Sequence, residues 1–594
     1  MSQIVVLNAG GQYCHLIARR IRELGVHAVV GDIGKPAPEL AAARGIIISG
    51  GPASVVEPTS PSVDPRIYAL GVPILGICYG HQLMARDLHG RVEPGVTKEY
   101  GHSSLHAGDC LLFRSVPKRE LRVWMSHGDT VVDIPSGFTI VGETDDCKVA
   151  AMEDRGRRFF GLQFHPEVVH TDHGSEILRS FVFDVCRATA DWDPRARLEQ
   201  VLAGIRKTAG DRKVFFLISG GVDSTVAFSL CATALGANRV LGLFVDTGFM
   251  RESDEDAMHY LERTVGSRAV RVADRSADFF AALTGITNPE RKRAIIGDAF
   301  VAVQEDEFGR LGLHARDWLL GQGTIYPDTI ESGGAQHAAK IKTHHNRSPR
   351  IQALIDQGRV IEPLVEFYKD EVRVLGEQLG LPHDVVWRHP FPGPGLAVRC
   401  VCADATAAVQ KASIPLPTGV TGFIVPVRTV GVQGDERSYS NLLAIEGAGA
   451  VEAAGTLARR VTNEDRSINR VVDIVYRRDG RAFERLAIHP ATLTRERIAL
   501  LRNADDLVTR IVRAHGLYDA IWQFPVGMLP LGTAPGRETI VLRPVNSRDG
   551  MTAEYGRLPT AVVQEVARAL ATLGRVDAVL YDVTNKPPAT IELE

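Results

Sequence analysis

Short apolar runs that end in a glycine-containing turn recur along the first half of the chain. In the N-terminal region these runs are IVVLNAG (4–10), GIIISGGP (45–52) and VPILGICYG (72–80). A helical pattern, LIARRIRELG (16–25), separates the first two, and Gly25 ends it. Strands that alternate with helices build a parallel sheet with helices on its faces. We therefore predict a doubly wound α/β domain at the N-terminus.

The same pattern returns in the middle of the chain. The apolar run KVFFLIS (213–219) leads through GGVDS into the helical run TVAFSLCATAL (225–235), and VLGLFVDTG (240–248) supplies the next strand. This order predicts a second, Rossmann-like α/β domain. Near residue 403 the sequence becomes rich in small residues and proline, which is typical of a boundary. We predict three regions, which are residues 1–190, 191–402 and 403–594.

The C-terminal region contains a weak internal repeat. IVPVR (424–428) resembles IVLRP (540–544), and Arg-Val pairs beginning at Arg470 and Arg575 each lead into a similar apolar strand. Two copies of one small α+β unit would explain this, and chance similarity of apolar strands is the alternative. If the copies are real, IVPVR and IVLRP can cover each other's exposed face within one chain, which predicts a monomer.

Composition excludes several classes of protein. Of 594 residues, 45% are apolar and 23% are charged, and the net charge is −3. This near-neutral balance argues against a nucleic-acid partner, and no run reaches the ~18 apolar residues of a membrane span. The N-terminus lacks the features of a secretory signal. Eight cysteines without any CxxC pair indicate a reducing compartment, so we expect a cytoplasmic protein with no membrane partner.

Cys78 is a candidate nucleophile, because it lies between two glycines at the end of an apolar run. A cysteine on a sharp strand-to-helix turn is accessible, and the following helix N-terminus favours the thiolate. A buried core cysteine is the alternative. The segment GLQFHPEV (161–168) favours catalysis, because His165 and Glu167 are two positions apart and project to the same side of an extended chain. His165 can then take the thiol proton while Glu167 holds the imidazole.

The N-terminal motifs together resemble those of the triad glutamine amidotransferases. GGP, GICYGHQ, MSHGD and FHPEV occur in that family's order and span nearly all of residues 1–186. The resemblance implies a glutaminase with a Cys78, His165 and Glu167 triad, whose oxyanion is held by Gly51 and Tyr79. The family usually has Asp where this chain has Asn8, which lies outside the triad.

The segment SGGVDST (219–225) is a candidate phosphate-binding loop. Its glycines let the backbone approach phosphate oxygens, and a helix N-terminus favours anions. It lacks the lysine of a Walker A loop, and an ordinary glycine-rich turn is the alternative. With VDTG (245–248), the segment resembles the N-type ATP pyrophosphatases. That resemblance implies magnesium near Asp223 and an ATP site made of Ser219, Gly220, Gly221, Val222, Asp223, Ser224, Thr225 and Asp246.

Segments further along the chain resemble the glutamine-hydrolysing GMP synthetase family. They are KRAIIG, IKTHHN, HPFPGPG, QGDER, IWQFP and KPPATIELE. The resemblance implies that ATP adenylylates xanthosine monophosphate (XMP) with loss of pyrophosphate, and that ammonia from glutamine then displaces AMP. The implied small molecules are XMP, ATP and glutamine, with Mg2+ beside ATP and no organic cofactor. The implied XMP contacts are Arg293, Asp435, Gln523, Lys586 and Glu592. Lys342, His344 and His345 form a cationic loop suited to cover phosphates as a lid, and a solvated basic loop is the alternative.

The order of the C-terminal motifs departs from the short bacterial form of that family. QGDER precedes IWQFP here, as in the longer form known from eukaryotes, whose dimerisation-like region is duplicated. The chain is therefore expected as a monomer or homodimer. The alternatives are an amidotransferase-coupled NAD or tRNA-modifying enzyme and a catalytically silent regulatory relative. KPPATIE and HPFPGPG argue against the first, and the intact triad and SGGVDS against the second.

Overall fold

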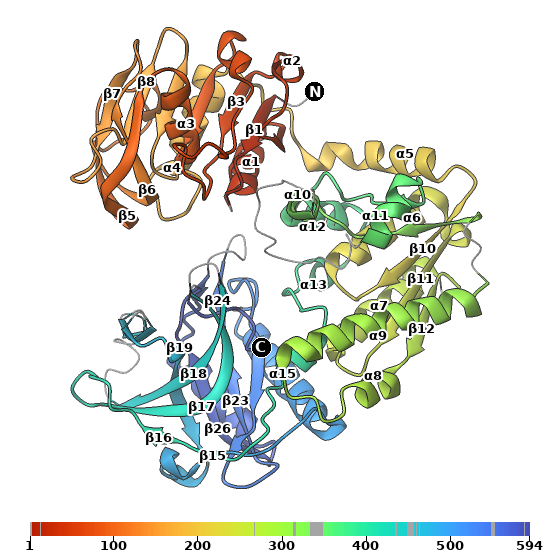
Figure 1. Cartoon of the computed structure of the whole chain (residues 1–594). Coiled ribbons are helices and arrows are strands. Elements are labelled where there is room, and N and C mark those ends of the chain that lie inside the picture. Colours follow the sequence, from red (N-terminus) through yellow and green to blue (C-terminus); the bar gives the residue numbers. More distant parts are fainter. Residues whose placement is uncertain are drawn as a thin grey trace. The chain divides into compact units, whose positions relative to one another are not determined.

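The computed structural model divides the chain into two compact units (Figure 1). Unit 1 contains Met1–Leu198, Ile325–Pro349 and Val365–Glu371, and unit 2 contains Glu199–Thr324, Arg350–Leu364 and Val372–Glu594. The structure describes residues 3–594 except 12, 267, 313–315, 333–348, 434–435, 448–454, 456, 459, 463, 548–552 and 587. Within the described part, no helix is long and apolar enough to cross a bilayer.

Unit 1 is built on a nine-stranded sheet in the order β2-β1-β3-β4-β9-β8-β7-β5-β6. Its first five strands are parallel, and they are β2 (Ala28–Asp32), β1 (Ile4–Asn8), β3 (Gly45–Ile48), β4 (Ile74–Ile77) and β9 (Phe159–Leu162). The others are antiparallel to their neighbours, and they are β8 (Ala151–Asp154), β7 (Thr139–Glu143), β5 (Arg91–Ala107) and β6 (Glu120–Asp133). The predicted strands are thus β1, β3 and β4, which confirms the doubly wound N-terminal fold.

The helices of unit 1 cover both faces of this sheet, because alternate residues of β1 belong to different cores. Ile4 and Val6 join one apolar cluster, and Val5 and Leu7 join another. These helices are α1 (Cys14–Glu23), α2 (Ala37–Leu40), α3 (Tyr79–Asp87) and α4 (Gly174–Arg179). Helix α10 (Tyr326–Ser332) belongs to the later segment Ile325–Pro349 of unit 1.

Arg22 of α1 ties the two later segments of unit 1 to its N-terminal part. Its guanidinium lies over the rings of Trp192, Tyr326 and Tyr368, 4.5, 4.7 and 5.1 Å from their centroids. The same group forms a buried ion pair with Glu371 at 3.3 Å. Residues 325–332 therefore belong to unit 1, although the chain directly before them belongs to unit 2.

Unit 2 begins with a parallel five-stranded sheet in the order β12-β11-β10-β13-β14. The strands are β10 (Lys213–Ile218), β11 (Val240–Asp246), β12 (Val270–Asp274), β13 (Trp318–Gly321) and β14 (Val360–Ile361). The surrounding helices are α5 (Leu198–Ala209), α6 (Val222–Leu235), α7 (Glu252–Val265), α8 (Ser276–Ala282), α9 (Pro289–Arg310), α11 (Pro349–Asp356), α12 (Lys369–Gln378) and α13 (His383–Val386). This order confirms the predicted Rossmann-like arrangement.

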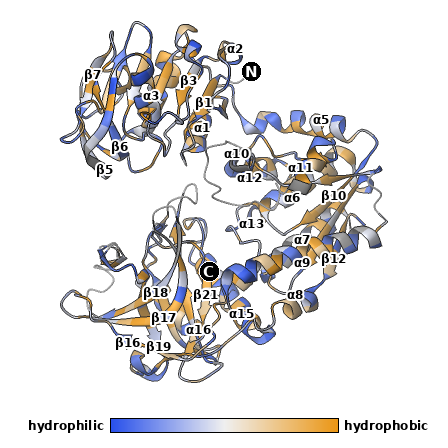
Figure 2. Ribbon diagram, in the orientation of Figure 1, coloured by the Kyte–Doolittle hydropathy of each residue, from blue (hydrophilic) through white to orange (hydrophobic). Residues whose placement is uncertain are grey.

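The C-terminal part of unit 2 has a seven-stranded sheet in the order β16-β17-β18-β19-β26-β23-β21. These strands are β16 (Gln410–Lys411), β17 (Val420–Gln433), β18 (Glu436–Gly447), β19 (Ile468–Arg477), β26 (Val576–Asp582), β23 (Glu538–Leu542) and β21 (Val526–Leu529). Helices α15 (Arg495–Ala514) and α16 (Thr560–Ala571) pack against it. Shorter strands complete the region, namely β15 (Ala407–Ala408), β20 (Ala487–Ile488), β22 (Leu531–Gly532), β24 (Val545–Asn546) and β25 (Glu554–Tyr555). Apolar side chains of both sheets of unit 2 share one core, and Figure 2 shows the apolar colouring concentrated on the strands.

The sheet is a duplicated arrangement, as the internal repeat predicts. In one half β17 is antiparallel to β18, and β18 is parallel to β19. In the other half β21 is antiparallel to β23, and β23 is parallel to β26. An antiparallel pairing of β19 with β26 joins the halves.

The expected match of IVPVR with IVLRP is wrong in detail. IVPVR lies in β17, whereas IVLRP begins in β23, whose counterpart is β18. The two segments therefore do not cover each other. Apolar β-branched strands look alike wherever they lie in a sheet, which explains the error. The Arg470 and Arg575 segments do correspond, because Arg470 lies in β19 and Arg575 directly precedes β26.

Candidate active sites

Cys78 occupies the predicted sharp turn between β4 and α3, but its side chain is buried, not accessible as we expected. Its φ is 51°, a left-handed conformation that costs free energy in a residue other than glycine. The flanking glycines make the turn possible, because a Cβ on Gly80 would lie 2.2 Å from the carbonyl oxygen of Ile48. The Cys78 N–H donates to the carbonyl of Leu162 at 2.7 Å, which fixes the turn against β9.

His165 and Glu167 lie next to each other and are both buried. Nδ1 of His165 is 2.7 Å from Oε1 of Glu167, and the thiol of Cys78 interacts with the same imidazole. The pair forms in the turn after β9, not by alternation along an extended strand as we expected. Burial disfavours the charge on His165, but Glu167 and Cys78 outweigh it and raise the pKa of His165 to about 10. His165 therefore carries a proton at neutral pH.

The glycine loop after β3 lies against these groups. A Cβ on Gly50 would be 2.9 Å from Cε1 of His165 and 3.5 Å from Cβ of Cys78. Each predicted oxyanion residue directly follows a residue of this cluster, since Gly51 follows Gly50 and Tyr79 follows Cys78. Tyr79 is also the first residue of α3, where N–H groups have no intrahelical acceptor.

Three contacts to this cluster were missed by the sequence analysis. Arg20 of α1 donates from Nε to the carbonyl of Glu167 at 3.0 Å, and the ring of Tyr13 meets His165 edge-on at 5.3 Å. The carbonyl of Ser126 lies 3.5 Å from Sγ of Cys78. Ser126 belongs to the MSHGD motif, which was a usable signal, whereas no sequence signal pointed to Tyr13 or Arg20. Asn8, the departure noted above, accepts from the N–H of Gly10 at 2.9 Å.

The segment SGGVDST forms the turn between β10 and α6. Gly220 has a φ of 74°, and Gly221 is the N-cap of α6, so Val222 and Asp223 lie in the first helical turn. Oγ of Ser224 donates to the carbonyl of Gly221 at 3.1 Å, and Oγ of Ser219 accepts from the N–H of Gly221 at 3.3 Å. The turn is thus held by its own hydroxyls. Thr225 is fully buried behind it.

This turn lies where the strand order of the sheet reverses, the usual ligand position in such sheets. Strands β10 and β13 are neighbours, and later strands continue outward on each side. Gly323 follows β13, and a Cβ there would be 2.8 Å from the carbonyl carbon of Asp223. Asp246, at the end of β11, accepts from the N–H of Gly248 through Oδ1 at 2.7 Å.

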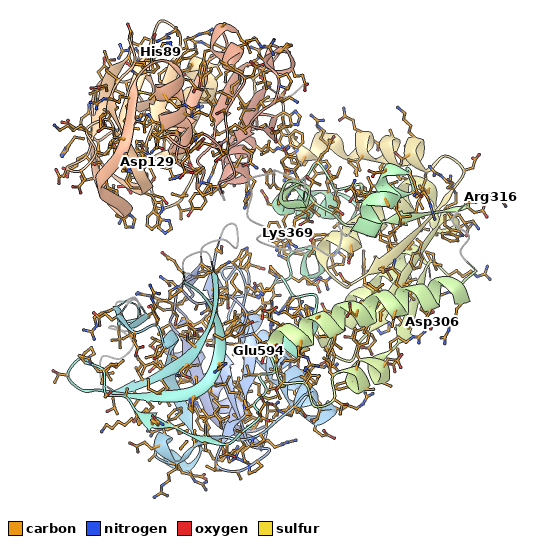
Figure 3. The ribbon with its side chains drawn as sticks, viewed as in Figure 1. His89, Asp129, Asp306, Arg316, Lys369 and Glu594 are labelled. Atoms are coloured by element: carbon orange, nitrogen blue, oxygen red, sulfur yellow. The ribbon has the colours of Figure 1, made fainter. Side chains whose placement is uncertain are left out.

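The C-terminal segment brings some of the expected XMP residues together. Nε2 of Gln523 donates to Oε1 of Glu592 at 3.2 Å, and Arg399 donates to both carboxylate oxygens of Glu592 at 2.8 and 3.0 Å. Arg293 donates to the main-chain oxygen of Glu594, which Figure 3 shows near α9. Lys586 is held through its backbone, which pairs with Ala553. Expected residues outside the described part of the chain are Asp435, Lys342, His344 and His345.

Two buried arginines hold the C-terminal segment through hydrogen bonds to its backbone. Arg470 and Arg543 are fully buried and share the carboxylate of Asp582. Arg470 also donates to the carbonyl of Glu592 at 3.1 Å, and Arg543 to that of Ile591 at 3.0 Å. Burial disfavours the charge on Asp582, but the two guanidinium groups outweigh it and lower its pKa. The terminal segment is thus part of the core.

Comparison with known proteins gives matches along the whole chain. Residues 5–185 match the family model described as glutamine amidotransferase class-I, residues 195–288 that of NAD synthase, and residues 510–593 that of the GMP synthase C terminal domain. A Leptospira interrogans protein named "Probable GMP synthase [glutamine-hydrolyzing]" is 42% identical, and the match covers 100% of this chain and 99% of that protein. The GMP synthases of Enterococcus faecalis and Symbiobacterium thermophilum are 37% and 38% identical, with 98% and 99% of their lengths covered.

Proposed function

The chain belongs to the glutamine-hydrolysing GMP synthase family, and on that basis we propose that it aminates XMP to GMP at the expense of ATP and glutamine. The observation that carries the proposal is that relatives of this name match the chain from end to end. The turn that carries Cys78 is the candidate site for glutamine hydrolysis, and the glycine-rich turn after β10 is the candidate site for the reaction with ATP.

In the glutaminase half, Sγ of Cys78 attacks the carboxamide carbon of glutamine. The N–H groups of Gly51 and Tyr79 would stabilise the oxyanion that forms. His165 carries the proton beside Sγ and passes it to the leaving nitrogen, which departs as ammonia. Glu167 fixes the ring through Nδ1, so that the other nitrogen faces the reacting atoms. Water then releases glutamate from the thioester.

In the synthetase half, the 2-oxygen of XMP attacks the α-phosphorus of ATP and the α–β bond breaks. Pyrophosphate departs with the bonding electron pair, and ammonia then displaces AMP from the adenylylated base. The backbone of residues 219–222 and the N-terminus of α6 suit the departing anion. The carboxylates of Asp223 and Asp246 are the hard oxygen donors that Mg2+ prefers, and bound Mg2+ would neutralise phosphate charge there.

For XMP itself, Arg293 and Lys586 suit the phosphate, while Gln523, Glu592 and Asp435 suit the ribose or base. The contact between Gln523 and Glu592 supports a shared site. Lys342, His344 and His345 are proposed as a lid over the phosphates.

Eight free, buried cysteines fit a reducing compartment such as the cytoplasm. Because the sheet of unit 2 contains both copies of the repeat, we expect a monomer, which light scattering tests.

The decisive experiment measures pyrophosphate release with XMP, ATP, Mg2+ and glutamine. The parent enzyme should release pyrophosphate and form GMP only when XMP is present. Asp223→Ala should abolish release with glutamine or ammonium as the nitrogen source, because it removes a carboxylate beside the phosphates. Turnover of the parent with deamido-NAD in place of XMP would refute the proposal.

A further inference from the structure

A buried arginine with no assigned role lies beside the glycine-rich turn after β10. Arg388 follows α13, and its side chain is only 4% exposed. Its Nη1 donates to Oδ1 of Asp254 at 3.2 Å. Its Nη2 is buried and has no hydrogen-bond partner within the described part of the chain. Because a buried donor without a partner costs free energy, this nitrogen suggests a role beyond packing.

Asp254 connects Arg388 to the phosphate turn. A Cβ on Gly220 would lie 3.3 Å from Cβ of Asp254, so this side chain packs directly against the turn. Arg388 is also attracted by the carboxylate of Asp223, in the first turn of α6. The guanidinium is thus connected to the turn through Asp254, and its charge lies within electrostatic reach of Asp223.

A second arginine shares Asp254 but differs in environment. Arg251 binds the same carboxylate through Nε and Nη2 at 3.3 and 3.2 Å, and its guanidinium stacks on Phe391 at 4.1 Å. Burial opposes the charge on Arg251, yet Asp254 and Asp505 outweigh it and raise its pKa. For Arg388 burial prevails over Asp254 and lowers the pKa. Because the two guanidinium groups share the Asp254 carboxylate, the positive charge of Arg388 is compensated less fully than that of Arg251.

The backbone on both sides of Arg388 is fixed by aromatic neighbours. Nε1 of Trp387 donates to Glu377 at 2.6 Å. The ring of His389 stacks on Tyr518 with centroids 3.8 Å apart, and the His389 N–H donates to the Tyr518 hydroxyl at 3.0 Å. Arg388 is therefore held in place before any ligand binds, as an effective positioning group must be.

We propose that Arg388 is a positioning residue of the ATP site, which orients the Asp223 carboxylate and the phosphate turn toward the pyrophosphate group. This inference rests on the proposed function, because it needs a reaction in which pyrophosphate leaves at this turn. As the α–β bond breaks, negative charge grows on the departing group. A fixed positive charge behind the turn keeps its donors aimed at that charge without reorganisation.

The test compares Arg388→Met with Arg251→Met in the full-length chain, because both variants remove one partner of Asp254. Binding of magnesium pyrophosphate is measured by calorimetry, and the KM for XMP is measured in the synthetase assay. We expect Arg388→Met to weaken pyrophosphate binding by at least about tenfold and Arg251→Met by less than about threefold. The KM for XMP should stay within about twofold in Arg388→Met, because the effect is confined to the phosphate turn.

Two outcomes would overturn the inference. In the first, Arg388→Met binds pyrophosphate as tightly as the parent does. In the second, both variants bind it equally weakly, which would assign the effect to Asp254 alone. If Arg388→Met does not fold, Arg388→Lys carries the test, with binding expected to be about tenfold weaker than in the parent because lysine lacks the planar fork. The binding readout does not depend on the substrate. A parent enzyme that binds pyrophosphate but does not turn over XMP would therefore refute the proposed function. The role of Arg388 would still be tested by comparing pyrophosphate binding in Arg388→Met and Arg251→Met.

Discussion

Gly323 lies directly against Ser224: a Cβ atom at position 323 would be 2.7 Å from the backbone nitrogen of Ser224. The contact joins the carboxyl ends of β13 and β10, where the phosphate turn lies. Gly323→Ala must displace backbone, so we expect pyrophosphate release to fall by at least about tenfold, which corresponds to roughly 1.4 kcal/mol. Glutaminase activity without XMP should be unchanged.

Gly309→Ala provides the matched control for this variant. Gly309 lies in α9, and nothing is within 4 Å of a Cβ built there. Alanine also favours the helix over glycine by about 1 kcal/mol. We expect parent activity and equal or higher thermal stability. Equal loss of pyrophosphate release in both variants would show that the close contact at Gly323 is irrelevant.

Cys78→Ala should separate the two halves of the reaction. Without the thiol, glutamine cannot be hydrolysed, and glutamine-dependent GMP formation should fall below detection. Added ammonium at mildly alkaline pH should restore synthesis, because the ATP site is untouched. Cys110→Ala is the control, since it removes another buried thiol in the same unit. A folded Cys78→Ala enzyme that fails with both nitrogen sources would contradict the assignment.

Glu167→Gln should destabilise the protein in a pH-dependent way. Because the folded pKa of His165 is raised to about 10 from an ordinary value of 6.5, its pairing contributes fully below about pH 6.5. That contribution fades as the pH rises toward 10. We expect a loss of about 3 kcal/mol at pH 6, seen as a lower melting temperature that approaches the parent's at pH 10.

Glu176→Gln is the control for this pH dependence. Glu176 pairs with His173 at 3.4 Å, but its side chain is 45% exposed, so water screens the interaction. The melting temperature of this variant should follow the parent's at every pH. A Glu167→Gln deficit that is the same at pH 6 and at pH 10 would show that His165 is neutral in the folded enzyme.

The candidate triad could be predicted from sequence because its signals are local. Cys78 sits in a strand-turn-helix pattern, and His165 and Glu167 lie in one short segment. Arg20 could not be predicted in this way, because it is 147 positions from Glu167 and meets it only through the packing of α1. Arg388 and Asp254, 134 positions apart, meet for the same reason.

The repeat shows a different limit of sequence reasoning. The duplication itself could be inferred, because the segments that begin at Arg470 and Arg575 have similar apolar patterns and belong to β19 and β26. The pairing of IVPVR with IVLRP was wrong, because apolar alternation identifies a strand but not its neighbours. Only the sheet order shows that β18 corresponds to β23 and β17 to β21.

Deletion of the C-terminal segment is a poor test of XMP binding, because the segment packs against two buried arginines. Deleting residues 586–594 would remove the carbonyls of Ile591 and Glu592 that accept from Arg543 and Arg470. Those guanidinium groups would remain buried with fewer partners, at a cost of several kcal/mol. We therefore expect the truncated chain to be unstable, so its loss of GMP synthesis would say little about XMP.

Lys586→Ala avoids this problem, because residue 586 is held through its backbone. Its N–H donates to the Ala553 carbonyl at 2.7 Å, and its carbonyl accepts from the Ala553 N–H at 3.0 Å. Both backbone bonds survive in alanine, so the main chain of the segment keeps its place when the ammonium group is removed. The KM for XMP should rise by one to two orders of magnitude, since a charge-assisted bond contributes roughly 1.5–3 kcal/mol. The KM for glutamine should hardly change. If the KM for XMP also stays at the parent value, the phosphate of XMP does not contact Lys586. Of the two cations that we propose for this phosphate, only Arg293 on α9 would then remain.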